Sequence, residues 1–146
     1  MTQQTHSTRA ISESEITRSW HLVDVKKSTL GRAVSEIAKH LIGKSKVTYV
    51  PYLDQGDYVV IINAKEVKVT GKKETEKTYT YYSGYPGGKR SVVYERMHKD
   101  NPREIIRHAV VGMLPKNKFR DPRLARLFIY EGTEHPYKEK FPISNS

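Results

Sequence analysis

The chain contains no cysteine among its 146 residues, which excludes disulfides, thiolate catalysis and cysteine-ligated zinc. No apolar run approaches the roughly 20 residues that a membrane-spanning helix needs. The first 19 residues also lack the apolar segment of a secretory signal, and they include Glu13 and Glu15. These absences predict a cytoplasmic protein, and the length predicts a single domain.

Acidic residues are also scarce, with 16 Asp and Glu against 26 Lys and Arg, for a formal net charge of +10. The excess is concentrated in residues 72–126, which hold fourteen basic and six acidic side chains. Basic residues clustered in this way are typical of proteins that bind a phosphate backbone. The alternative is a basic surface that only keeps the protein soluble.

Hydrophobic periodicity predicts alternating strands and helices along the chain. The predicted strands cover residues 20–25, 58–63, 65–71, 77–83 and 123–132. The predicted helices cover residues 28–43, capped by Ser28 and ended by Gly43, then 91–100 and 101–115. This order predicts an α/β fold in one compact domain, with a mixed or mostly parallel sheet covered by helices. We expect a flexible N-terminal arm over 1–19, the domain over 20–135 with basic loops, and a tail over 136–146.

The helix predicted after Asn101 has one apolar face. Asn101 is a candidate N-cap, Pro102 suits the first turn, and Pro115 ends the helix. The predicted core face consists of Ile105, Ile106, Ala109, Val110 and Met113.

The stretch "YTYYSGYPGGKRS", residues 79–91, is either a nucleotide-binding loop or a surface that grips nucleic acid. A P-loop requires GxxxxGK followed by Ser or Thr. Here Arg90 follows Lys89, and Ser83 stands where the first glycine belongs, so the motif fails twice. Glycines allow close approach of a sugar-phosphate chain, tyrosines stack on bases, and cations meet phosphates. The residues of this grip are Gly84, Gly87, Gly88, Tyr81, Tyr82, Tyr85, Lys89 and Arg90. For Tyr79 and Tyr81, the alternative is a place in the core.

Other catalytic patterns are weak. Asp54 and Asp57 flank Gly56 and could form an acid–base pair, but aspartates beside glycine more often stabilise a turn through local backbone hydrogen bonds. The six histidines never fall in HExxH spacing, and no GxSxG elbow occurs. The sequence therefore predicts no catalytic residues, metal, cofactor or small-molecule substrate.

Two further basic patches complete the candidate interface. Lys26 and Lys27 precede the N-terminus of the first predicted helix, where free amides favour anions. The stretch 115–126 contains Lys116, Lys118, Arg120, Arg123 and Arg126 around Phe119. Its two prolines disfavour a regular helix, so we predict a loop laid along RNA.

Four motifs occur in the order of one protein family: "TLGR" after a Trp-led strand, "GDYVVIINAKEVKVTGKK", "YYSGYPGG" and "AVVGMLPKNK". From about Trp20 to His135, the chain closely resembles the bacterial-type L13 family of large-subunit ribosomal proteins. The resemblance implies a compact α/β domain that binds large-subunit ribosomal RNA early in assembly and has no catalytic role. The long N-terminal arm and "KNKFRDPR", in place of a more glycine-rich version, depart from the family pattern.

The resemblance also implies specific RNA-facing positions. These are Lys26, Lys27, Arg32, Lys44, Lys46, Lys72, Lys73, Tyr82, Gly87, Gly88, Lys89, Lys116 and Lys118. The candidate site additionally includes Tyr85, Arg90, Arg120 and Arg123, because they lie in the aromatic and basic stretches. The predicted function is that of a structural constituent of the cytoplasmic ribosome, with ribosomal RNA and neighbouring large-subunit proteins as partners and no membrane association. The alternatives are a nucleotide-dependent enzyme and a regulatory RNA-binding module that acts off the ribosome.

Overall fold

The computed structural model describes residues 9–141, and a three-stranded parallel sheet lies at its centre. Its strands are β1 (Trp20–Asp24), β2 (Tyr58–Ile62) and β5 (Leu127–Ile129), in the order β1-β2-β5. The central strand β2 buries Val59, Val60 and Ile61 completely. This burial explains why β2 reads as a continuous apolar run, which is typical of parallel strands covered on both faces.

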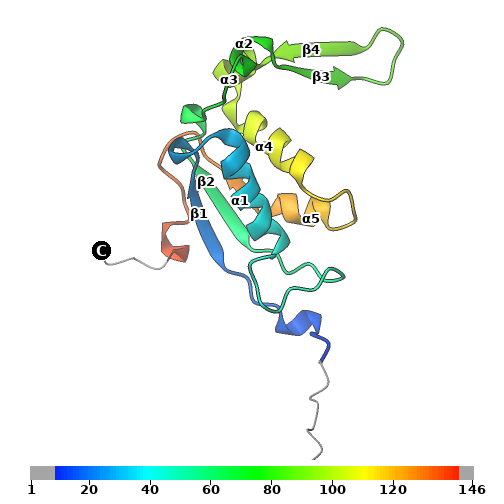
Figure 1. Cartoon of the computed structure of the whole chain (residues 1–146), viewed down its shortest axis with the longest axis vertical. Helices are drawn as coiled ribbons and strands as arrows, with labels where there is room; N and C mark the ends of the chain where they lie inside the picture. The colour runs from blue at the N-terminus through cyan, green and yellow to red at the C-terminus, as the bar shows by residue number, and fades with distance from the viewer. Residues whose placement is uncertain (1–8, 142–146) are drawn as a thin grey trace, which may run out of the picture.

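Two helices, α1 (Leu30–Ile42) and α4 (Pro102–Met113), pack together and cover one face of the sheet (Figure 1). The apolar stripe of α1 places Ala33, Val34, Ile37 and Leu41 at 0% exposure in the core. Gly43 ends α1 in the left-handed conformation at φ 86°, as predicted. The N-cap of α1 is Thr29 rather than the predicted Ser28.

Aromatic side chains cover the opposite face of the sheet. Trp20 stacks on Tyr58 with ring centroids 4.5 Å apart and on Phe128 at 5.9 Å. The segment after β5 folds back, so that Tyr137 lies 5.0 Å and Phe141 6.5 Å from the Trp20 ring. The predicted α/β class with a mostly parallel sheet is confirmed, with helices on one face and this aromatic layer on the other.

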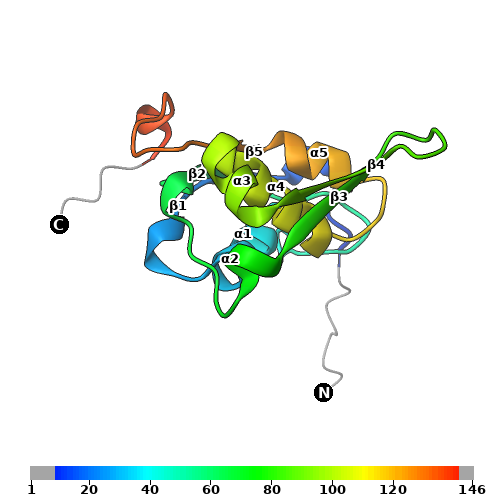
Figure 2. The same ribbon diagram turned by 90° about the horizontal axis from the view of Figure 1, so that it is seen from above.

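A second, two-stranded antiparallel sheet forms a hairpin that projects from the body in both views (Figures 1 and 2). It follows the short helix α2 (Lys73–Glu76) and consists of β3 (Thr78–Tyr82) and β4 (Lys89–Val93). The helix α3 (Tyr94–Asp100) then leads into α4. Tyr79, Tyr94 and Met97 are buried and anchor the base of the hairpin in the core.

Three predicted elements are wrong in part. Residues 91–93 belong to β4, so the helix predicted over 91–100 begins only at Tyr94. Residues 65–71 form no strand, because they have no partner beyond one bridge between Thr29 and Lys68, and Ala64–Glu66 is a short 3-10 helix. The predicted loop 115–126 contains a helix, α5 (Arg120–Ala125), which also shortens the final strand to β5. Pro122 fits there because it stands in the first turn, where its missing amide costs little.

Residues 9–19 have contacts of their own, whereas residues 1–8 of the predicted N-terminal arm lie outside the described part of the chain. Glu13–Glu15 form a 3-10 helix. The Arg18 guanidinium donates to the backbone oxygens of Gly56 and Asp54, at 2.5 and 3.0 Å. The end of this segment is therefore attached to the loop before β2.

The apolar face of α4 is confirmed for Ile105, Ile106 and Val110, which are fully buried. The prediction that Met113 lies in the core is wrong, because its side chain is 45% exposed. The helix ends at Met113, and Leu114, in extended conformation and 3% exposed, enters the core instead. Asn101 is the N-cap residue, but its side chain makes no capping hydrogen bond.

The fold predicts opposite outcomes for the same substitution at two positions of α4. Val110→Asp places an unpaired charge at a site with 0% exposure and should unfold the domain. Met113→Asp should change stability by less than about 1 kcal/mol, because this side chain reaches water. Thermal unfolding followed by circular dichroism measures both variants. A folded Val110→Asp protein, or an unfolded Met113→Asp protein, would contradict this assignment of the core.

Candidate nucleic-acid interface

The loop at the tip of the hairpin is closed by its own backbone. The Gly88 amide donates to the Tyr85 oxygen at 2.9 Å, with Pro86 and Gly87 at the centre of the turn and Gly87 at φ 72°. A proline followed by a glycine with positive φ is the pattern of a type II turn. The loop joins two antiparallel strands, whereas a P-loop joins a strand to a helix. Its backbone thus builds a hairpin tip instead of a phosphate cradle.

The end of the hairpin carries an aromatic side chain and a cation on each face. Tyr81 lies opposite Arg90, and Tyr82 lies opposite Lys89, so each pair shares one face. Tyr81, Tyr82 and Tyr85 are 46%, 69% and 75% exposed. Tyr79 is instead buried, with its ring 5.1 Å from that of His108 in an edge-on contact. Of the two tyrosines with a possible place in the core, only Tyr79 is there.

A second basic group surrounds the base of the hairpin. Arg32 in the first turn of α1, Lys73 at the start of α2 and Lys77 just after α2 line a cavity of about 430 Å³, and none of its lining residues is acidic. Lys72 and Lys73 also line a neighbouring depression. In the first turn of α1, Thr29 makes no side-chain capping bond. These cations therefore concentrate positive charge next to a helix N-terminus.

A third group lies in the loop between α4 and α5 and at the first residue of α5. Lys116 and Lys118 are exposed, and Arg120 is half-buried. The Lys118 ammonium lies 5.2 Å from the centroid of the Phe119 ring, at the distance of a cation–π contact. Lys116 and Lys118 are thus exposed to solvent in a loop.

Not all predicted positions come together. Lys44 follows the C-terminus of α1, about 20 Å along the helix from Arg32. Lys27 lies in the 3-10 helix Val25–Lys27, and its neighbour Lys26 forms an ion pair with Glu66 at 2.7 Å. The structure therefore separates these residues from the hairpin group, or uses them partly in protein contacts.

Most of the predicted cations have no acidic partner within residues 9–141. Only Lys26, Lys46 and Arg123 of the predicted set form ion pairs. The cations without an ion pair in this part of the chain are Lys27, Arg32, Lys44, Lys72, Lys73, Lys89, Arg90, Lys116, Lys118 and Arg120. Their charges are available to an anionic partner.

Comparison with known proteins identifies the family of this chain. A family model described as "Ribosomal protein L13" matches residues 18–136. The chain belongs to the ribosomal protein L13 family. Large ribosomal subunit protein uL13 of Caldanaerobacter subterraneus subsp. tengcongensis is 46% identical over 129 residues, which cover 88% of this chain and 90% of the relative. The protein of the same name from Staphylococcus aureus (strain JH9) is 43% identical over 131 residues, which cover 90% of each chain.

Two of the positions expected from the L13 resemblance and the basic stretches face inward. All three donors of the Lys46 ammonium are occupied, by Asp57 Oδ1 at 2.6 Å and by the backbone oxygens of Thr17 and Gln55 at 2.6 and 2.7 Å. Arg123 is 2% exposed, and its Nε donates to Asp54 at 3.3 Å. Neither side chain is free to meet phosphate, so we remove both from the interface.

Asp54 is the centre of a buried ion-pair cluster. The Arg126 guanidinium donates twice to its carboxylate, with both distances 2.8 Å, and Arg123 adds a third bond. Burial acts to raise the pKa of Asp54, but the hydrogen bonds and charges of Arg126 and then Arg123 outweigh it, and the pKa is lowered. The predicted local turn hydrogen bond is long, with the Gly56 amide 3.5 Å from Asp54 Oδ1. Arg126 is not recognisable as a partner from the sequence, because 72 residues separate it from Asp54.

Asp57, His21 and His40 form a second cluster whose ligand atoms lie within 4.8 Å of one another. A metal ion lies in the plane of each imidazole that binds it, but these two rings are stacked 3.9 Å apart with planes 24° apart. Asp57 is already bonded to the Lys46 ammonium and, at 2.8 Å, to His21. Burial, and then the charge of His21, lower the pKa of His40, which favours the neutral ring. The cluster as arranged is a packing contact and does not fit a metal.

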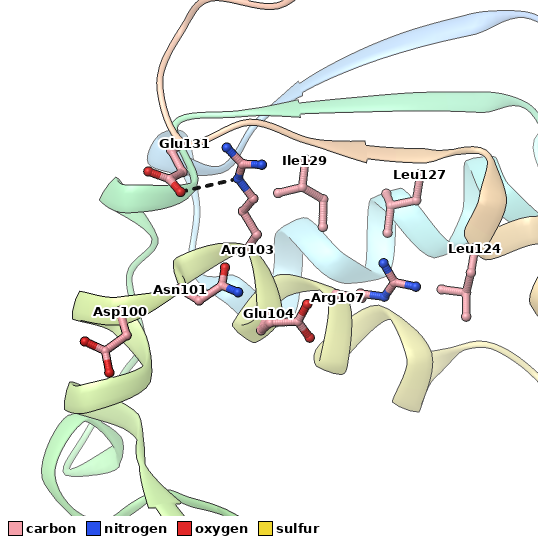
Figure 3. Close-up of a pocket in the computed structure, with 9 residues that line it drawn as sticks. All are labelled: Asp100, Asn101, Arg103, Glu104, Arg107, Leu124, Leu127, Ile129 and Glu131. Atoms are coloured by element: carbon pink, nitrogen blue, oxygen red, sulfur yellow. Dashed lines mark ion pairs between the residues drawn. The ribbon is translucent and has the colours of Figure 1, made fainter.

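A cavity of about 580 Å³ lies between α4 and β5 (Figure 3). Its floor is apolar, with Leu124, Leu127 and Ile129, and Arg103 forms an ion pair with Glu131 at 3.4 Å. Three acidic side chains against two arginines line it, so it does not favour a phosphate. No nucleophile paired with a base lies among its lining residues.

The Asp54 cluster predicts acid-sensitive stability. Because the folded pKa of Asp54 is below its ordinary value of 3.8, the stabilisation is present above about pH 4 and is lost as the pH falls through the folded pKa. Asp54→Asn leaves two guanidinium groups without their carboxylate and should cost about 3 kcal/mol at pH 7. Its unfolding free energy should also depend less on pH below 4.

Urea unfolding between pH 3 and pH 7 measures this effect. Asp100→Asn is the control, because Asp100 is exposed and its one ion pair within residues 9–141 is a surface pair with Arg96. Equal losses of stability in the two variants would show that the cluster is not a special contributor.

Proposed function

We propose that this chain is a structural, non-catalytic component of the large ribosomal subunit that binds and stabilises ribosomal RNA, with the early role in assembly that the family resemblance implies. Membership in the L13 family supports the proposal, since the relatives carry the name of a large-subunit protein. The observation that carries the RNA-binding part is the set of cations without an acidic partner in residues 9–141, together with the exposed tyrosines on a projecting hairpin.

The chemistry of the interface follows from these groups. Lys and Arg side chains displace counterions from phosphates and supply affinity that does not depend on sequence. Tyr82 and Tyr85, on the hairpin, offer flat faces on which unpaired bases stack. Because the hairpin extends beyond the body, it can enter a groove or junction of folded RNA while α1 and α2 lie against the backbone.

The proposed partners are large-subunit ribosomal RNA and the ribosomal proteins next to it, in the cytoplasm. Within residues 9–141, no helix is both long and apolar enough to cross a membrane. Against a nucleotide-dependent enzyme, the glycine-rich stretch lacks the P-loop residues and closes a hairpin. No ATP or GTP turnover is proposed.

The salt dependence of RNA binding tests this proposal. Affinity for large-subunit ribosomal RNA should fall steeply with salt, with a log–log slope of about 0.7–0.9 for each phosphate contact. The double variant Lys72→Ala/Lys73→Ala should reduce the slope by about 1.5 and leave the melting temperature unchanged, because neither side chain has an acidic partner within the described residues. Filter binding at several salt concentrations measures the slope.

The matched control is Lys65→Ala/Lys99→Ala, which removes the same charge from lysines paired with Glu131 and Glu95. This variant should keep the wild-type slope. Identical slopes for both double variants would mean that net charge alone attracts the RNA, and the assigned interface would be wrong.

A further inference from the structure

The cavity of about 430 Å³ at the base of the hairpin has two chemically different parts. Three elements enclose it: the first turns of α1, the segment from Val69 to Lys77, and the last turn of α4. Its cationic side chains are Arg32, Lys73 and Lys77, and its apolar ones include Val69, Ala109 and Met113. The tyrosines and cations of the hairpin, by contrast, project away from the body.

The apolar wall is continuous with the core. Val69 and Ala109 are half-buried and pack against core residues. Met113 stands 45% exposed at the wall, and its sulfur lies 3.7 Å from the Ser35 hydroxyl of α1. A polarisable thioether next to a flat apolar surface is a favourable contact for an aromatic ring.

All charged side chains that line the cavity are cationic. Arg32, Lys73 and Lys77 have no acidic partner within residues 9–141, and no acidic residue lines the cavity. The Lys77 ammonium lies 5.3 Å from the centroid of the Tyr79 ring, which holds it near the cavity by a cation–π contact. The cavity thus combines a surface for a ring with charges for an anion.

We propose that this cavity accepts one unstacked nucleotide of the bound RNA, with its base against Val69, Ala109 and Met113 and its phosphate at Arg32 and Lys73. The inference rests on the proposed RNA-binding function and names a specific subsite within it. The volume lies in the range of about 300–1,000 Å³ that holds small organic ligands. A paired base in a helix cannot enter such a cavity, so the nucleotide comes from a loop, bulge or junction.

Gly31 offers a way to close the cavity without disturbing the fold. It lies in the first turn of α1 and lines the cavity, and a Cβ built there meets no atom within 4 Å. Gly31→Leu therefore adds a bulky side chain at the wall of the cavity, while Gly31→Ala adds only a methyl group and serves as the matched control. Both variants should fold, since leucine and alanine favour helix over glycine.

The first measurement is the affinity of each protein for large-subunit ribosomal RNA at one salt concentration. Gly31→Leu should bind about five- to tenfold more weakly than wild type, the lower range for the loss of one stacked base, and Gly31→Ala should bind like wild type. Equal affinity of the leucine variant and wild type would overturn the subsite while the RNA-binding function stands. A wild-type protein that does not bind the RNA would instead reject the proposed function.

The second measurement separates a base from a phosphate. Methyl-labelled protein is titrated with adenosine or uridine 5′-monophosphate, and with ribose 5-phosphate, and the methionine methyl signals are followed by NMR. The nucleotides should shift the Met113 signal but not that of Met97, which is 8% exposed and does not line the cavity. Gly31→Leu should abolish the shift. No shift with either nucleotide, or an equal shift with ribose 5-phosphate, would show that the cavity does not receive a base.

Discussion

The ion-pair cluster around Asp54 fixes the arrangement on which the rest of the structure depends. Parallel strands begin at one edge of their sheet, and here residues next to the start of all three strands meet at the loop 54–57. Arg18 lies just before β1, Asp57 precedes β2, and Arg126 precedes β5. Arg126 holds the Asp54 carboxylate with two bonds of 2.8 Å, and Arg18 donates to the backbone of the same loop.

Close packing at this edge leaves little freedom in the sequence. A Cβ at Gly56 would lie 1.8 Å from the Leu41 oxygen, and one at Gly43 would lie 2.7 Å from the Gln55 oxygen. The Asp57 amide also donates to the His40 oxygen at 3.0 Å, which ties the end of α1 to the start of β2. The carboxylates that sequence analysis considered for acid–base chemistry therefore serve the assembly of the sheet.

The basic residues of the chain fall into two groups with different roles. Ion pairs with Asp54 and Asp57 occupy Arg123, Arg126 and Lys46, whose side chains are buried or mostly buried. The cations of the hairpin, of α2 and of the loop before α5 have no acidic partner within residues 9–141, and their side chains are exposed or partly exposed. The net charge of +10 thus covers two groups of cations: those around Asp54 and Asp57 are neutralised within the protein, and those without an acidic partner in residues 9–141 remain available for phosphate.

Local signals in the sequence were sufficient wherever local physics decides the structure. The apolar stripe of α1, its stop at Gly43 and the buried run of β2 were all readable from a few residues. The alternation of apolar and polar residues over 65–71 predicted a strand that does not form, because the fold provides no neighbouring strand beyond the single bridge to Thr29. Arg123 was assigned to RNA because its partner Asp54 lies 69 residues away, and Met113 was assigned to the core because periodicity does not reveal where a helix ends.

The central claim is that the exposed tyrosines, and the cations that have no acidic partner in the described part of the chain, hold this protein on the large ribosomal subunit. Sedimentation of the tagged protein in a cell extract, with a high-salt wash before fractionation, tests the claim most directly. We predict that the protein migrates with large subunits after the wash. A protein found only in the free pool would contradict the account, and it would favour a regulatory RNA-binding role away from the ribosome.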